Sequence, residues 1–177
     1  MNIRKSKTDT RNKIARKKLK SSGRISNHEN FGSKSSLSGI SNILGGMKVL
    51  HRKIESRLDL IEIGRKGLSK NAFEHLANYL NYSAKQMADI LPITERTIQR
   101  YNKNKHFSPD VSDHILQIAE VSAKGAEVFH DKSKFISWMN YPCVSFANKT
   151  PLSLLQSKFG VDMILDELGR IEHGVFS

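Results

Sequence analysis

The polar residues from Thr94 to Lys103 have the side chains that read DNA bases. An arginine can donate two hydrogen bonds to the edge of a guanine, and a glutamine can pair in the same way with an adenine. Hydroxyl groups such as those of Ser83 and Thr97 suit phosphate oxygens, which a helix N-terminus also favours. We therefore expect a DNA-contact surface formed by Ser83, Lys85, Thr94, Glu95, Arg96, Thr97, Gln99, Arg100 and Lys103.

Two short helices must hold these residues in place. Ser83 is suited to cap a first helix over 84–91, and Pro92 ends that helix. Thr94 is suited to cap a second helix over 95–103. The small and apolar residues that pack the two helices together are Met87, Ala88, Leu91, Ile93, Ile98 and Tyr101. This pattern predicts a helix-turn-helix whose second helix enters the major groove, with a turn whose shape Pro92 leaves open.

The alternative is a helical hairpin with an ordinary solvated face. Arginine, lysine and glutamine are common on such faces, so these residue types alone do not decide the question. We favour DNA binding because the small and apolar positions match the helix-turn-helix pattern together, and because a strongly basic segment precedes them.

Residues that could support catalysis or hold a metal are scattered. None of the seven histidines forms a His-x-x-x-His pair with acidic ligands, so a zinc site is not indicated. Cys143 follows a proline, and an incidental or structural thiol is a simpler interpretation than a nucleophile. Gly45-Gly46 is too short for a phosphate loop. We expect a protein that is not an enzyme and that needs no metal and no cofactor.

The positive charge is concentrated at the start of the chain. Residues 1–24 contain ten Lys or Arg and one acid, a net charge of +9 out of +12 for the whole chain. A stretch rich in Ser, Gly and Asn follows, from Ser21 to Gly46, and it has too few apolar residues for a core. We expect residues 1–45 to be a disordered basic tail and linker that meets a polyanion. A transit peptide is the less favoured alternative.

Cysteine usage and hydropathy indicate the compartment. One cysteine excludes an internal disulfide, which favours a reducing environment. No apolar run approaches the roughly 20 residues of a membrane span, and the basic start is not followed by the apolar stretch of a secretory signal. We expect a cytoplasmic protein with no membrane contact.

Helical patterns continue on both sides of the helix-turn-helix. Apolar residues recur at helical spacing, and Ser108-Pro109 and Thr150-Pro151 each pair an N-cap with a proline at the first helical position. The remaining helices are expected over 47–61, over 70–80, from 109 to 129, after Asp131, from 151 to Gly160, and from Val161 to Gly174. Because no convincing sheet pattern occurs, the sequence predicts an all-α fold.

Several motifs in the second half occur together and in order. They are Ile93-Thr-Glu-Arg-Thr-Ile-Gln-Arg100, Trp138-Met-Asn-Tyr-Pro142, Thr150-Pro151-Leu-Ser-Leu-Leu155, Gly160, and Leu168-Gly-Arg-Ile-Glu-His-Gly174. From about residue 64 to residue 176 the chain resembles the Xre-type antitoxins, which carry a C-terminal toxin-binding domain and pair with RES-domain toxins. It departs from the family pattern in having Ala147-Asn148-Lys149 before the Thr-Pro, where two glycines are frequent, and His114 where a basic residue is common.

The resemblance implies a function. It implies an antitoxin of a type II toxin–antitoxin system that neutralises a RES-type, NAD-degrading toxin by direct binding and represses its own operon. The C-terminal end of the antitoxin would then lie near the active-site cleft of the toxin. The toxin-facing candidates that it implies are Thr150, Pro151, Leu154, Arg170, Glu172, His173, Gly174 and Phe176.

The predicted organisation has three parts. The disordered tail covers residues 1–45, an Xre-like helix-turn-helix DNA-binding domain covers 46–130, and a small helical toxin-binding domain covers 131–177. We expect a homodimer on a palindromic operator, within a larger complex with the toxin. One alternative is a stand-alone transcription regulator whose helical C-terminal domain dimerises or senses a ligand. Another is an interaction module that has lost DNA binding.

Overall fold

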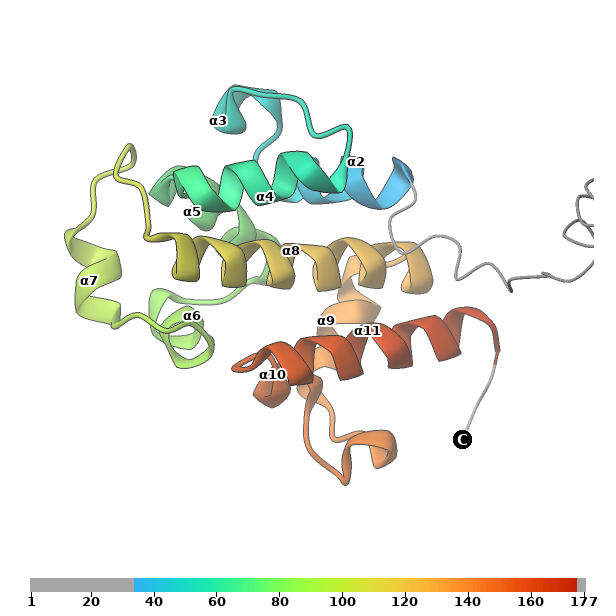
Figure 1. Ribbon diagram of the computed structural model, residues 1–177. Helices are drawn as coiled ribbons and strands as arrows, with labels where there is room; N and C mark the ends of the chain where they lie inside the picture. Colours follow the sequence, from blue (N-terminus) through green and yellow to red (C-terminus); the bar gives the residue numbers. More distant parts are fainter. Residues whose placement is uncertain (1–33, 175–177) are drawn as a thin grey trace, which may run out of the picture. The chain divides into compact units, whose positions relative to one another are not determined.

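Helix α8 (Pro109–Phe129) is the central element of the fold, and helices from both ends of the described chain pack against it (Figure 1). The computed structural model describes residues 34–174, and this part of the chain is helical with no sheet, so the predicted all-α class is confirmed for it. Pro109 occupies the first helical position after Ser108, as the sequence predicts. Buried residues cover more than half of the circumference of α8, whereas Asp113, Gln117, Glu120 and Lys124 form a strip that is not buried, so helices can pack on two sides of α8.

Two helices cover one side of α8 and one long helix covers the other (Figure 1). Helix α2 (Lys34–Ile43) and helix α4 (Arg57–Lys66) lie on the first side, and helix α11 (Lys158–Glu172) lies on the second. In this arrangement α8 is the central layer of a three-layer helical packing.

The expectation of an unstructured linker as far as residue 45 is wrong for residues 34–45. Helix α2 packs along α8, its residues Leu37 and Ile40 are buried, and Leu44 directly after it is also buried. At Gly39 the approach is close, because a Cβ at this glycine would lie 3.1 Å from the Cβ of Ala123. Average composition missed this helix because a few apolar residues at helical spacing suffice when each of them is buried. Residues 1–33 lie outside the described part of the chain.

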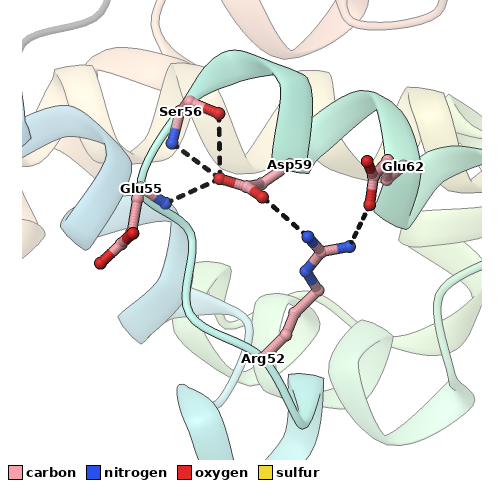
Figure 2. Close-up of polar contacts among 5 residues, drawn as sticks. All are labelled: Arg52, Glu55, Ser56, Asp59 and Glu62. Atoms are coloured by element: carbon pink, nitrogen blue, oxygen red, sulfur yellow. Dashed lines mark hydrogen bonds and ion pairs between the residues drawn. The ribbon is translucent and has the colours of Figure 1, made fainter.

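The single helix expected over 47–61 is instead two helices with a turn between them. Helix α3 (Met47–Leu50) ends at His51, and α4 begins only after Ser56. Asp59 explains the late start, because its carboxylate accepts hydrogen bonds from the main-chain N–H groups of Glu55 at 3.0 Å and Ser56 at 2.8 Å (Figure 2). Arg52 reaches across the turn to the same carboxylate at 2.7 Å.

These contacts also favour the ionised form of Asp59. Hydrogen bonds from the main chain of Glu55 and Ser56 lower the pKa of this carboxyl below its ordinary value, and the Arg52 guanidinium adds to the effect. Arg52 also pairs with Glu62, at 2.8 Å (Figure 2). The turn between α3 and α4 is therefore held by one carboxylate that is both a helix cap and an ion-pair partner.

Helix α5 (Lys70–Leu80) follows the predicted bounds, with Phe73, Leu76 and Leu80 buried. After α8 come helix α9 (Lys132–Asn140), a 3₁₀ turn η1 (Val144–Phe146) and helix α10 (Pro151–Leu154). Asp131 and Thr150 cap α9 and α10 as expected.

Gly160 does not end a helix, contrary to the sequence prediction. It lies in the first turn of α11, where its N–H donates to the Ser157 hydroxyl at 3.1 Å. A Cβ at this position would clash with the carbonyl oxygen of Leu154, so only glycine lets α10 and α11 meet this closely. A glycine that ends a helix and a glycine that allows two helices to approach closely look the same in a sequence. The contact with Leu154 shows that Gly160 is of the second kind.

Within residues 34–174, no helix combines the length and the apolar content that crossing a bilayer requires.

Candidate functional surfaces

The helix-turn-helix lies at the N-terminal end of α8 (Figure 1) and is formed by helix α6 (Ala84–Ile90) and helix α7 (Glu95–Arg100). Ser83 and Gln86 make a capping box at the start of α6, in which the Ser83 N–H donates to the Gln86 side chain at 2.9 Å. Met87 and Ile98 are buried between the helices and the core. The hydrophobic contacts predicted from the sequence therefore fix the position of α7.

The exposed face of α7 has the predicted polar residues. Arg96, Gln99 and Arg100 are exposed, and Thr94 caps the helix by accepting from the Thr97 N–H at 3.3 Å. Gln99 donates to Glu95 at 3.0 Å. This bond holds the amide against the helix surface, so Gln99 must exchange it for a base contact if it is to read adenine.

Helix α7 is shorter than predicted, and Lys103 is not on it. The helix ends at Arg100, and Tyr101 is extended, with its ring stacked on Phe107 at a centroid distance of 5.2 Å. Lys70 donates from its Nζ to the Tyr101 carbonyl at 2.8 Å. These contacts stop the helix, and Lys103 follows in an exposed loop beside its end.

A basic hollow that the sequence analysis missed adjoins the end of α7. It has a volume of about 310 Å³ and is lined by Thr97, Arg100, Tyr101, Asn102 and Lys105. The Lys105 ammonium lies 5.8 Å from the centre of the Tyr101 ring. The signal was present as the run of polar and basic residues from Asn102 to His106, but only the helix end at Arg100 brings it beside the recognition helix.

The first group of toxin-facing candidates has local structural roles. Thr150 accepts from the Ser153 N–H at 3.2 Å and caps α10, Pro151 is buried, and Leu154 is half-buried. His114, one of the departures from the family pattern, hydrogen-bonds from α8 to the Leu155 carbonyl at 2.5 Å. This corner therefore joins the two halves of the structure.

The second group lies at the end of α11. Arg170 is exposed and pairs with Glu167 at 2.6 Å, whereas Glu172 pairs with Lys124 of α8 at 2.6 Å. His173 is exposed, and Gly174 ends the helix with a φ of 68° that suits glycine. Phe176 lies outside the described residues.

Large apolar side chains are also exposed in this half, and the sequence analysis did not select them. They are Tyr141, Val144, Phe159 and Met163. Within residues 34–174, no group of three His, Cys, Asp or Glu side chains is placed to hold a metal ion. Cys143 is half-buried, with its main chain paired to Lys149.

Comparison with known proteins finds two family models that match consecutive parts of the chain. Residues 59–120 match the antitoxin Xre-like helix-turn-helix domain, and residues 124–174 match the antitoxin Xre/MbcA/ParS C-terminal toxin-binding domain. A Photorhabdus laumondii protein named Antitoxin Xre is 31% identical over 102 residues, which are 55% of this chain and 69% of that protein. The chain belongs to the Xre antitoxin family. A second Antitoxin Xre, from Yersinia enterocolitica, is 28% identical over 120 residues, which are 67% of this chain and 81% of that protein.

The matched segments meet inside α8. In this Xre antitoxin one continuous helix therefore belongs to both the helix-turn-helix and the toxin-binding domain. Helices α2 and α3 precede the first matched residue, and they pack on α8 and α5 respectively.

Proposed function

We propose that this Xre antitoxin neutralises a RES-type, NAD-degrading toxin by direct binding through residues 131–177 and represses its own operon through the helix-turn-helix of residues 46–130. The observation that carries the proposal is the combination of an exposed Arg/Gln helix face on α7 with a C-terminal segment that matches a toxin-binding model. The protein would act by binding alone, with no catalytic step of its own.

The DNA contacts divide by chemistry. Arg96 and Arg100 would each donate two hydrogen bonds to guanine, and Gln99 would pair with adenine. Phosphates would be bound by Ser83, Lys85, Thr94 and Thr97, by Lys103 in the loop, and by Lys105 in the basic hollow. Glu95 would hold Gln99 until DNA arrives. A homodimer would place two copies of α7 about 34–36 Å apart, one turn of DNA, on a palindromic operator.

Binding to the chain's own promoter fragment tests the DNA half of the proposal. Replacing Arg96 and Arg100 together by alanine should weaken specific binding at least tenfold, because each bidentate contact contributes about 1–3 kcal/mol of discrimination. The matched control replaces the exposed Lys134 and Lys158, which removes the same charge away from α7. Equal losses in the two double variants would assign the effect to charge alone and would remove α7 from base recognition.

Co-expression tests the toxin half. We expect the gene beside the one for this chain to encode a RES-domain protein, and this protein should stop growth and deplete cellular NAD when it is expressed alone. Co-expression of the antitoxin should restore growth and the NAD level, and the antitoxin should co-purify with the toxin. Growth arrest that persists, with no complex on the affinity column, would overturn the proposed partner.

A further inference from the structure

The outer face of α11 has an apolar surface that the fold does not use. Phe159 is 83% exposed and Met163 is 46% exposed. They are four residues apart in one helix, so their side chains lie on the same face, one turn from each other. The opposite face of α11 already has buried residues, among them Val161, Ile164 and Leu168. Core packing therefore does not explain an apolar outer face.

The η1 turn extends this surface to one side. Ser145 donates to the Glu167 carboxylate at 2.9 Å, and Glu167 lies one turn after Met163 on the same side of α11. This bond brings the turn alongside the edge of α11. Val144, next to Ser145, is 84% exposed. We call Val144, Phe159 and Met163 together the α11 ridge.

The ridge is held firmly although it is exposed. Phe146 of the same turn is buried, and its ring lies 6.4 Å from the ring of Trp138 in α9. Glu167 is also paired with Arg170, at 2.6 Å, on the exposed side of α11. An apolar surface on such a rigid support can bind a partner at little cost in conformational entropy.

Acidic groups border the ridge. Asp162 and Asp166 are exposed. They lie beside Phe159 on α11, on the side of the ridge that is opposite to the η1 turn. A partner suited to this surface has an apolar groove for the ridge and basic side chains along the rim that faces these carboxylates.

We propose that the α11 ridge is the docking site of the toxin, with Phe159 and Met163 as its central contacts. The inference rests on the proposed function. The ridge lies wholly within residues 124–174, the segment that matches the toxin-binding domain, and it is continuous with Arg170, a toxin-facing candidate from the sequence. Large buried side chains at the centre of an interface contribute most of its binding energy.

Titration of the antitoxin against the purified RES-domain protein encoded beside its gene tests the docking site. Phe159→Glu and Met163→Glu should each weaken the complex at least tenfold, and the double variant more than a hundredfold. Because both side chains are exposed, the melting temperature and the affinity for the promoter fragment should stay at the wild-type values. The matched control is Leu58→Glu, which changes a side chain that is 70% exposed on α4, across α8 from α11 (Figure 1). It should leave toxin binding unchanged.

Each other outcome overturns the docking site in a distinguishable way. Wild-type affinity in the double variant, with a functional wild-type complex, would place the toxin elsewhere and leave the proposed function intact. No complex with the wild-type protein would overturn the function and the docking site together. A double variant that loses self-association on light scattering before toxin is added would assign the ridge to a second copy of the chain.

Discussion

At the scale of single residues, two glycines of α11 occupy opposite environments. A Cβ at Gly160 would meet the carbonyl oxygen of Leu154, whereas a Cβ at Gly169 would have no atom within 4 Å. Gly160→Ala should therefore lower the free energy of unfolding by about 1–3 kcal/mol, because the added methyl group forces α10 and α11 apart. Gly169→Ala should stabilise it by up to about 1 kcal/mol through helix propensity. Urea unfolding of both variants checks the contrast, and equal shifts would contradict the close contact.

The same residues mark how far the sequence could predict the site. Ser83, Thr94 and Thr150 are caps in the structure because capping depends on the next three residues alone. The role of Gly160 depends on Leu154 in the preceding helix, a tertiary contact that local spacing does not encode. Exposure of Phe159 has the same origin, since an apolar residue in an amphipathic pattern is assigned to the core until its helix is oriented.

At the scale of helices, α2 is the element whose presence changes the expected domain plan. Ile40 is 1% exposed in the contact with α8. Ile40→Ala should cost about 2–5 kcal/mol, as expected for a large-to-small change in a core, whereas Asn42→Ala on the exposed side should cost less than about 0.5 kcal/mol. Denaturant midpoints measure the difference. A small effect of Ile40→Ala would make α2 a peripheral addition.

Helix α2 was missed and α5 was predicted to the residue for one physical reason. Four apolar residues of α5, Phe73, Leu76, Ala77 and Leu80, follow one face in a segment with few breakers. In α2 the apolar positions are separated by Ser and Gly, whose low helix propensity argues against a helix until α8 buries the apolar side. Helix α7 shows the converse case, since propensity allowed it to continue and the contacts of Tyr101 ended it.

At the scale of the whole molecule, the uneven charge of the sequence bears on DNA affinity. Residues 1–24 have a net charge of +9, and the rest of the chain has +3. We propose that this segment meets phosphates beside the operator. The slope of the logarithm of the binding constant against the logarithm of the salt concentration should then become less steep by up to about 8 when this segment is deleted, because fewer counterions are released. Binding titrations over a series of salt concentrations measure the slope, and an unchanged slope would remove the segment from the complex.

The shared core predicts what a C-terminal truncation can test. Ile164 and Leu168 of α11 are fully buried in the core that includes α8, and the same helix α8 supports α4 and, at its N-terminal end, the helix-turn-helix. Removing residues 150–177 would expose the α8 side that α11 covers, at a cost of roughly 25 cal/mol for each Å² of apolar surface. The truncated protein should therefore lose its cooperative melting and most of its promoter binding together with toxin binding.

Loss of both functions in one truncation would reflect the shared helix α8. Variants of the α11 ridge, in contrast, should lose toxin binding and keep promoter binding. A truncated protein that melts cooperatively and binds its promoter as the full chain does would contradict the shared core and would make the two halves independent domains.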